Sequence, residues 1–305
     1  MFHVKRRLDN DGSTSRAGPS CRHARRERAS SPTHHESAPV HRDRRARNGN
    51  NFGRRPISTT IPATDRLILA LDVPTASEAR SIVDALADTV SFYKIGLELF
   101  LSGGYFELAD WLRSNDKKVF ADLKLFDVPQ TVRSAVRQLR TRDVDFVTVH
   151  GNDAILRAAC DAAAGDLGIL AVTVLTSLDR ADMEDLGFEA DIGDVVLSRA
   201  RRAESIGCAG VISSGHEASR VRSAVSRRFR IVVPGIRAAL EAGTDDQKRT
   251  VDVESAFQAG ADYIVMGRPI RNAPDPARAA ASVQKRISAW FGQADSDQEH
   301  AAQTM

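Results

Sequence analysis

The sequence predicts an α/β fold, a single-domain (β/α)8 TIM barrel preceded by a disordered N-terminal extension. Eight short apolar, β-branched segments recur along the chain, and segments with helical spacing separate them. The segment LDVPTAS (71–77) follows the first of them, where a dinucleotide-binding sheet would carry GxGxxG. Eight strands alternating with helices over roughly 200 residues are typical of a closed barrel rather than an open doubly wound sheet.

The predicted strands are nearly continuous runs of apolar residues rather than alternating patterns. Such runs indicate strands that are buried on both faces, as in a parallel sheet. In order they cover residues 66–72, 92–97, 118–123, 144–150, 168–175, 208–213, 230–235 and 262–267.

Three of the intervening segments show clear helical character: 76–89, 129–142 and 194–207. In the first, Ala79, Val83 and Leu86 recur at the spacing of one helix face, with Ile82 beside them. The third ends at Gly207, the residue type that most often closes a helix. We therefore expect helices to connect the strands and cover the barrel.

The N-terminal extension, residues 1–63, differs in composition from the rest of the chain. Residues 1–60 hold 14 of the 43 Lys and Arg residues but 5 of the 40 Asp and Glu residues, so the remainder is formally −6. The segment has almost no apolar periodicity, which predicts disorder. It is interpreted as a dispensable extension; an organelle transit peptide and an RNA-binding segment are the alternatives. The barrel is expected over 64–291, with a polar tail over 292–305.

Other sequence features bear on the class of protein. Cys21, Cys160 and Cys208 are odd in number and lack CxxC spacing, which argues against a disulfide framework or a zinc site and fits a reducing compartment. No apolar run reaches the ~18 residues expected of a membrane span, and the N-terminus lacks the apolar core of a secretory signal. We expect a cytoplasmic protein with no membrane association. Nucleic acid is not the expected ligand, because the excess of basic residues lies outside the predicted folded part.

Polar residues gather where the predicted strands end. The active sites of (β/α)8 barrels lie at the C-terminal ends of their strands, so these residues are candidates for chemistry. They are Asp72, Lys94, Asp122, Lys124 and, just beyond, Asp127; then His150, Thr176, Ser177, Arg237, Gly267 and Arg268. A rim salt bridge explains any one of these charges, but it explains the full set poorly.

The segment DLKLFDVPQT (122–131) carries the most information. Asp122 and Lys124 are two residues apart and point to the same side of an extended backbone. Carboxylates at Asp122 and Asp127 favour the charged form of Lys124, which fits a proton donor rather than a Schiff-base nucleophile. Asp122 would repel an anionic substrate group beside it. An ion-paired strand end remains the alternative for these three residues alone.

The last two strand ends predict a phosphate site. Loops after strands 7 and 8 often bind phosphate in such barrels, and here they contain PGIR (234–237) and MGRPI (266–270). Backbone N–H groups near Gly235 and Gly267 can approach an anion, while Arg237 or Arg268 can add a bidentate contact. The polar stretch from Arg237 to residue 249 is expected to form a closing lid.

Together these motifs resemble the orotidine 5′-phosphate decarboxylase family. The resemblance rests on LDVP (71–74), YKIG (93–96), DLKLFDVPQT (122–131), VTVLTS (172–177), PGIR (234–237), DDQKR (245–249) and GRPI (267–270). It implies decarboxylation of orotidine 5′-monophosphate to UMP and carbon dioxide, the last step of de novo pyrimidine synthesis. It also implies a homodimer with shared active sites that uses no metal and no organic cofactor.

Roles for individual residues follow from the resemblance. Lys124 would protonate C6 of the pyrimidine, and Asp122 would lie against the departing carboxylate. Lys94 and Asp72 would hold the ribose, while Asp127 and Thr131 would reach the partner subunit's site. Thr176 and Ser177 would contact the base, Gln247 would bridge base and phosphate, and Arg237, Gly267 and Arg268 would bind phosphate. Phe126 and Ala238-Ala239 depart from the common pattern outside the catalytic positions.

Three other functions remain open at this stage. The nearest is a Mg²⁺-dependent sugar-phosphate decarboxylase or aldolase of the same superfamily, which shares the DxKxxD pattern; VPQT and Gln247 favour the nucleotide enzyme. A non-catalytic nucleotide-binding barrel is disfavoured, because pure binding gains little from a carboxylate that repels its ligand. The third is RNA binding through the extension. His150 is expected to pack or to form a hydrogen bond rather than to transfer protons.

Overall fold

The computed structural model describes residues 61–237 and 251–303, with side chains described up to residue 292. The chain divides into two compact units, Met1–Phe52 and Gly53–Met305, and every described residue belongs to the second. The extension predicted to be disordered therefore lies, except for its last three residues, outside the described residues. Gln247 and most of the predicted lid also lie outside them.

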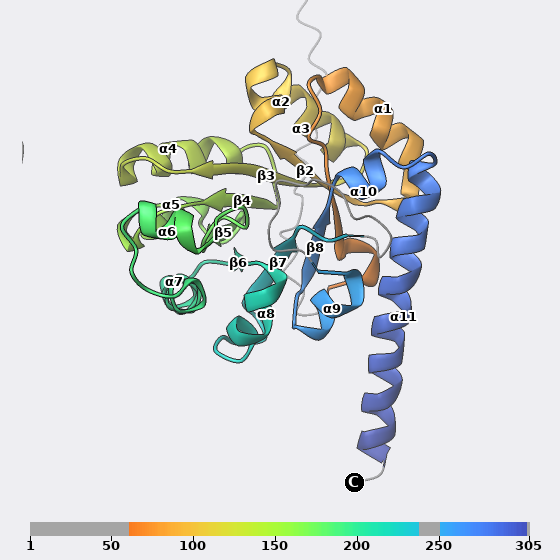
Figure 1. The fold of residues 1–305 in the computed structure, drawn as a ribbon. Coiled ribbons are helices and arrows are strands. Elements are labelled where there is room, and N and C mark those ends of the chain that lie inside the picture. Colours follow the sequence, from red (N-terminus) through yellow and green to blue (C-terminus); the bar gives the residue numbers. More distant parts are fainter. Residues whose placement is uncertain (1–60, 238–250, 304–305) are drawn as a thin grey trace, which may run out of the picture. The chain divides into compact units, whose positions relative to one another are not determined.

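Eight parallel strands form a closed barrel, as the sequence predicts (Figure 1). Each strand pairs with the next, and β8 closes on β1 through the Leu67–Ile264 pair. The strands are β1 (Leu67–Ala70), β2 (Phe92–Gly96), β3 (Lys118–Leu125), β4 (Phe146–Val149), β5 (Gly168–Val172), β6 (Gly210–Ile212), β7 (Arg230–Pro234) and β8 (Tyr263–Met266). All eight lie within the predicted segments except that β3 extends to Leu125.

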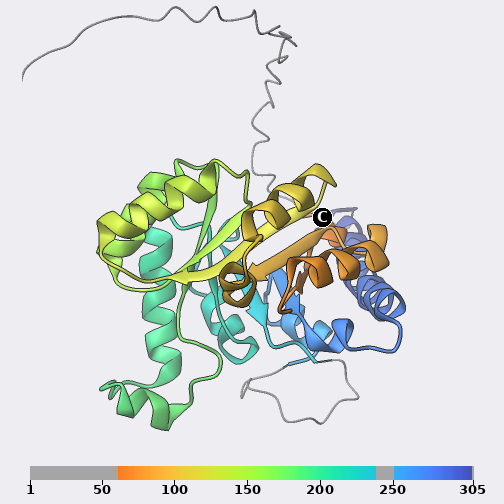
Figure 2. The same cartoon turned by 90° about the horizontal axis from the view of Figure 1, so that it is seen from above.

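Helices connect the strands and lie outside them, which Figure 2 shows from above. The α-helices are α1 (Ala76–Leu86), α2 (Leu97–Ser102), α3 (Tyr105–Ser114), α4 (Pro129–Arg140), α5 (Asp153–Ala163), α6 (Arg180–Asp185), α7 (Ile192–Ile206), α8 (Gly215–Arg222), α9 (Val253–Gln258), α10 (Arg268–Arg271) and α11 (Pro276–Gln303). Two 3-10 helices, η1 (Ala63–Asp65) and η2 (Ala87–Thr89), complete the described elements.

Local sequence signals explain where the predicted helices begin and end. Thr75 caps α1 by accepting a hydrogen bond from the backbone N–H of Glu78. Pro129 occupies the first turn of α4, where its missing N–H costs nothing. Gly207 ends α7 with a φ of 97°, a conformation that glycine adopts without strain. The helices predicted over 76–89, 129–142 and 194–207 are thereby confirmed.

The barrel interior is filled by side chains at its N-terminal end and becomes polar towards its C-terminal end. A cluster of eight buried residues occupies the interior, among them Phe92, Phe120 and Tyr263, with Phe146 packed against it. Side chains alternate along a strand, so the residue two positions further on also faces inward. Above Phe92 comes Lys94, and above Phe120 comes Asp122. The charged side chains of Lys94 and Asp122 therefore lie directly above this apolar layer, towards the C-terminal end of the barrel.

Helix α11 passes through Gly292, where the sequence predicts the start of a polar tail, and that boundary stays a prediction. Within 61–237 and 251–303, no helix combines the length and apolar character that a membrane span requires.

Candidate active site

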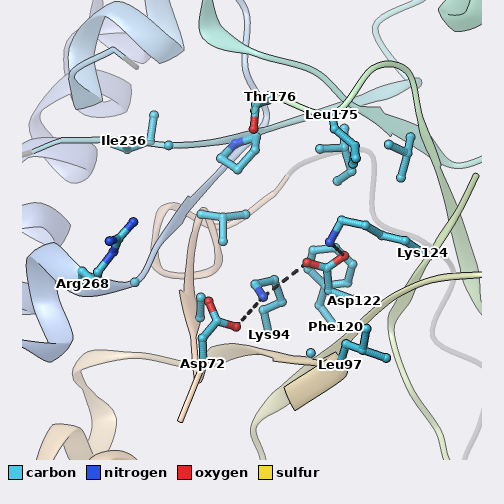
Figure 3. Close-up of a pocket in the computed structure, with 18 of the residues that line it drawn as sticks. Asp72, Lys94, Leu97, Phe120, Asp122, Lys124, Leu175, Thr176, Ile236 and Arg268 are labelled. Carbon is cyan, nitrogen blue, oxygen red and sulfur yellow. Dashed lines mark hydrogen bonds and ion pairs between the residues drawn. The ribbon is translucent and has the colours of Figure 1, made fainter. Parts of the chain in front are cut away.

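A pocket of about 520 Å³ opens at the C-terminal ends of the strands (Figure 3). Residues from seven of the eight strands and from the segments that follow them line it, which agrees with the position expected of an active site in this fold. Its polar and charged lining residues are Asp72, Lys94, Glu98, Asp122, Lys124, Thr176, Arg268 and Arg271. Much of the remaining lining consists of backbone and apolar groups, which belong to Phe120, Val172, Val174, Pro234, Gly235, Ile236 and Gly267.

Four charged residues of alternating sign form a chain along one side of the pocket. Lys94 Nζ lies 2.8 Å from Asp72 Oδ1 and 3.2 Å from Asp122 Oδ2. Lys124 Nζ lies 2.9 Å from the other carboxylate oxygen of Asp122, Oδ1. Figure 3 shows Lys94 between the two carboxylates, with Lys124 beside Asp122. Each inner member of this chain thus contacts two partners of opposite charge, which offsets the cost of its burial.

The pKa values of the two inner members reflect these partners. Burial alone lowers the pKa of Lys94, but the negative charges of Asp122 and Asp72 outweigh burial and raise it above its usual value. Burial alone raises the pKa of Asp122, but Lys94 and Lys124 outweigh burial and bring it to about 2. Both groups are therefore charged at neutral pH, and the pocket contains a fixed carboxylate.

Exposure separates the inner residues from the outer ones. The side chains of Lys94 and Asp122 are 10% and 13% exposed, whereas that of Lys124 is 45% exposed. Lys124 is thus the more accessible cation of this chain, while Lys94 holds the two carboxylates in place. Lys94 is a residue of the β2 interior, and Lys124 lies near the end of β3.

The opposite side of the pocket is formed mainly by backbone. The chain leaves β7 through Pro234 and Gly235, and the φ of Gly235 is 75°, in the region that favours glycine. After β8 comes Gly267, followed by Arg268, which lies on the side of the pocket away from Lys124 in Figure 3. This combination of glycine backbone and an arginine suits an anion such as phosphate.

Several predicted site residues do not line the pocket. Thr176 is buried and lines it, but Ser177 is exposed and outside the lining. Asp127, Thr131 and Arg237 are also outside it. Asp127 accepts a hydrogen bond from the backbone N–H of Val128, with an N–O distance of 2.6 Å. The predicted contact of Asp127 with Lys124 is therefore not found within one subunit, where Asp122 is the carboxylate that contacts Lys124.

His150 lies beside the pocket rather than in its lining. Its ring packs against Phe126 at 71°, with 5.3 Å between the ring centroids. Among the residues that the structure describes, none forms a hydrogen bond with its buried Nδ1. Burial, followed by the charge of Arg199, lowers the pKa of the imidazole. A neutral ring in an aromatic contact supports the packing interpretation, which stays a prediction.

Three residues at this site, Glu98, Arg271 and Thr148, are not among the predicted ones. Arg271 lines the pocket and donates a hydrogen bond from Nη1 to the carbonyl oxygen of Asp72. It follows Arg268 by three residues on α10, a spacing that places two side chains on the same helix face. Thr148, in β4, donates to Asp122 Oδ1 over 2.9 Å. Thr148 lies two residues after Phe146 on the same strand, and this spacing indicates that its side chain also points into the barrel.

Within the part of the chain that the structure describes, no three His, Cys, Asp or Glu side chains converge in a way that could hold a metal ion. Both oxygens of Asp122 face lysine ammonium groups instead. The charged side chains that line this pocket are those of Asp72, Lys94, Glu98, Asp122, Lys124, Arg268 and Arg271.

Comparison with known proteins gives consistent matches over the barrel. The sequence profile described as "Orotidine 5'-phosphate decarboxylase / HUMPS family" matches residues 65–283. A protein of Methylococcus capsulatus named orotidine 5'-phosphate decarboxylase is 59% identical over 231 residues, which cover 76% of this chain and 95% of that protein. A protein of the same name from Xanthomonas euvesicatoria is 52% identical, covering 76% and 96%.

Solved structures match as well. The crystal structure of orotidine 5'-phosphate decarboxylase from Lactobacillus acidophilus is similar with a TM-score of 0.65 and 30% sequence identity. The match covers 73% of this chain and 99% of that one. A structure of the same name from Pyrococcus horikoshii matches with a TM-score of 0.59 and 28% identity, covering 72% and 98%.

Proposed function

The chain belongs to the orotidine 5'-phosphate decarboxylase / HUMPS family, and from this membership we propose that it converts orotidine 5′-monophosphate to UMP and carbon dioxide. The observation that carries the proposal is the charge chain from Asp72 through Lys94 and Asp122 to Lys124 on one side of the pocket. It supplies a fixed carboxylate next to an accessible ammonium group, which is what loss of a carboxylate followed by protonation requires.

Asp122 acts on the carboxylate that leaves. In the proposed pose the carboxylate at C6 of the pyrimidine lies beside Asp122, whose pKa of about 2 keeps it ionised. Two negative charges in a partly buried site repel each other, and the repulsion disappears as neutral carbon dioxide forms. The interaction therefore destabilises the substrate more than the transition state, which lowers the barrier.

Lys124 supplies the proton. When the bond between C6 and the carboxylate breaks, its electron pair stays on C6, and one N–H proton of the Lys124 ammonium moves to that carbon. Lys124 is left as a neutral amine and recovers a proton from water. Its Nζ is held 2.9 Å from Asp122, so the donor lies next to the place where the negative charge develops.

The rest of the nucleotide would extend across the pocket. Asp72 and Lys94 hold the ribose hydroxyls, and Thr176 contacts the base from the β5 side, with Ser177 and Gln247 completing these contacts. Gly267 and Arg268 bind the phosphate, with Arg237 nearby. The distribution of charge supports this orientation, because Lys124 and Arg268 lie on opposite sides of the pocket in Figure 3.

The second candidate within the family is the Mg²⁺-dependent sugar-phosphate enzyme. The pairing of both Asp122 oxygens with lysines favours the nucleotide decarboxylase, because an oxygen engaged by an ammonium group is poorly placed to bind a divalent cation. The curated relatives at 59% and 52% identity carry the decarboxylase name. We propose that the reaction needs no metal and no organic cofactor.

We also propose a homodimer with shared active sites, located in the cytoplasm. Asp127 is flanked by two exposed apolar side chains, Phe126 (68% exposed) and Val128 (63% exposed). Apolar groups on both sides of an exposed carboxylate are suited to an interface that places the carboxylate in a neighbouring site. Thr131, also exposed, lies in the first turn of α4. The free thiols of Cys160 and Cys208 suit a reducing compartment.

The test follows the loss of orotidine 5′-monophosphate absorbance with purified protein, in buffer and in excess EDTA. We expect the same rate in both. Loss of the activity in EDTA with recovery on adding Mg²⁺ would favour the metal-dependent enzyme. A preparation without nucleotide turnover that acts on hexulose or ketogulonate phosphates would overturn the assignment.

A further inference from the structure

Thr148 occupies a central position beneath the charge chain. Its side chain is fully buried in β4. The hydroxyl donates a hydrogen bond to Asp122 Oδ1, with 2.9 Å between the two oxygens. The same hydroxyl accepts a hydrogen bond from the backbone N–H of Lys124, also at 2.9 Å. One hydroxyl thus contacts both residues to which the proposed chemistry is assigned.

The backbone of Lys124 needs such a contact. Its φ is 46°, in the left-handed region, which costs a non-glycine residue roughly 1–2 kcal/mol. The pairing between β3 and β4 shifts register between Ala121 and Leu125, so the regular ladder is interrupted at Lys124. The ladder resumes where the backbone N–H of His150 donates to the carbonyl oxygen of Leu125 at 3.0 Å. Across the interruption, the Thr148 side chain bonds the Lys124 N–H.

We propose that Thr148 is a positioning residue for the decarboxylation, fixing the Lys124 backbone and the Asp122 carboxylate relative to each other through one hydroxyl. The inference rests on the proposed function, because it concerns the geometry of the proton donor. The hydroxyl has one hydrogen to donate and lone pairs to accept, and the two contacts use one of each. Thr148 does not line the pocket and acts through its neighbours.

The hydroxyl has two consequences for the site. First, it restricts where the Lys124 side chain begins, and therefore where its ammonium group lies relative to Asp122. A displacement of about 1 Å in a catalytic group can cost roughly a hundredfold in rate. Second, its hydrogen bond favours the ionised form of Asp122 and contributes to the low pKa of that carboxyl. Removing the hydroxyl should therefore change both the turnover rate and its pH dependence.

The alternative is an ordinary buried threonine that satisfies its own hydroxyl and affects only stability. The chain offers a matched control in Thr173, which is 1% exposed and donates from Oγ1 to the carbonyl oxygen of Ile212 at 2.8 Å. Thr173 follows β5, is outside the pocket lining and, within the described part of the chain, forms no hydrogen bond with a member of the charge chain. Thr173→Val thus removes a buried, bonded hydroxyl without touching Asp122 or Lys124.

The experiment compares Thr148→Val, Thr148→Ser and Thr173→Val by kcat and KM for orotidine 5′-monophosphate, UMP affinity and Tm. We expect Thr148→Val to lower kcat by about 10- to 100-fold, with UMP affinity changed less than about threefold. Thr148→Ser should recover most of the loss. Thr173→Val should lower Tm but keep kcat. In Thr148→Val the acid limb of the kcat profile should move to higher pH, because Asp122 loses a hydrogen bond that favours its ionised form.

The outcomes separate this inference from the proposed function. If the wild-type protein does not decarboxylate the nucleotide, the proposed function fails first. If the wild type is active and Thr148→Val matches it in kcat and pH profile, the positioning role is wrong. Equal losses in Thr148→Val and Thr148→Ser would also overturn it. Should the valine variant not fold, Thr148→Ala and Thr148→Ser carry the test, because that pair differs only in the hydroxyl.

Discussion

The two sides of the pocket are built in different ways. On the side of β1, β2 and β3, four side chains of alternating charge hold one another through contacts of 2.8, 3.2 and 2.9 Å. On the side of β7 and β8, the lining consists largely of Pro234, Gly235, Ile236 and Gly267, with Arg268 as the main charge towards the pocket. The first side is a network of side chains, and the second is a turn of backbone with an arginine beside it.

This difference matches the work proposed for each side. Proton transfer and charge repulsion depend steeply on distance, so the groups that perform them benefit from mutual fixation. A phosphate is large, symmetric and doubly charged, and backbone N–H groups with one guanidinium can bind it in several ways. Substitutions on the charged side should therefore reduce kcat, while substitutions on the backbone side should reduce binding as well.

The largest effect is expected from Lys124→Ala. Without the proton donor, kcat should fall by about 10⁴-fold or more, at the upper end of what proton transfer contributes. UMP affinity should remain within about tenfold, because the phosphate side is untouched. Stopped-flow or long-time absorbance assays measure kcat, and calorimetry measures UMP affinity. Lys285→Ala, at an exposed position on α11, is the matched control. Robust turnover by Lys124→Ala would contradict the proposed mechanism.

Asp127→Ala tests whether the charged side is completed by a second subunit. Alone it should be nearly inactive, like Lys124→Ala. When the two inactive proteins are mixed and allowed to exchange subunits, half of the dimers should be hybrids with one intact site and one doubly substituted site. Activity should then rise to about a quarter of the wild-type value. Subunit exchange shown by mass spectrometry without any recovery would disprove the shared site, although Lys124 could still be the donor.

On the backbone side, Arg268→Ala should reduce kcat/KM roughly 10²- to 10³-fold, because it removes a charged contact to phosphate. This reduction corresponds to a loss of several kcal/mol of transition-state stabilisation. Binding energy from the phosphate can also assemble the site, so part of the loss should appear in kcat. Soluble guanidinium should restore part of the activity in this variant. Arg278→Ala, an exposed position in α11, is the control. Wild-type kinetics in Arg268→Ala would show that the phosphate binds elsewhere.

The sequence alone was sufficient for the fold and for the place of the charged residues. Apolar runs identified all eight strands, and the rule that strand ends form the site led to Asp72, Lys94, Asp122 and Lys124, which the structure brings together. The backbone conformation expected at Lys124 differs from the one in the structure. Asp122 and Lys124 were placed on one side by an extended backbone, whereas Lys124 has a φ of 46° and still contacts Asp122.

Other features could not be derived from sequence for physical reasons. The register shift beside Lys124 leaves no pattern in an apolar strand, and a threonine such as Thr148 is an ordinary strand residue. The partners of Lys94 depend on the distances between β1, β2 and β3 in the closed barrel, and the spacing of these strands along the sequence does not specify those distances. The role proposed for Asp127 involves a second subunit, and Gln247 lies outside the described residues.

The acid stability of the protein provides a smaller test of the charged side. The pKa of Asp122 is lowered from 3.8 to about 2, so its contribution is present above about pH 4 and is lost as pH falls towards 2. By linkage this amounts to about 2 kcal/mol. The difference in unfolding free energy between the wild type and Asp122→Asn, measured in urea, should shrink over that range.

Asp262, at the N-terminal end of β8, is a control of opposite sign. Burial raises its pKa, although the N–H of Ile231 and the charge of Arg222 partly offset the effect. Its protonated form is therefore favoured by folding, and the wild type should gain relative to Asp262→Asn as pH falls. If both variants show the same pH dependence, the ion pairs of Asp122 are not what distinguishes the charged side.

The smallest effect is expected from the N-terminal extension, which carries 14 basic residues but none of the family motifs. A chain that begins at Pro62 keeps β1 and every residue that lines the pocket. Its kcat/KM should equal that of the full chain, and a loss above about tenfold, or 1.4 kcal/mol, would show that the extension stabilises the transition state. The same pair of proteins tests RNA binding at low and high salt, since a basic segment binds nucleic acid in a salt-dependent way. Binding by the full chain alone would assign the extension a role separate from both sides of the pocket, whereas a change in KM for the phosphorylated substrate would connect it to the backbone side.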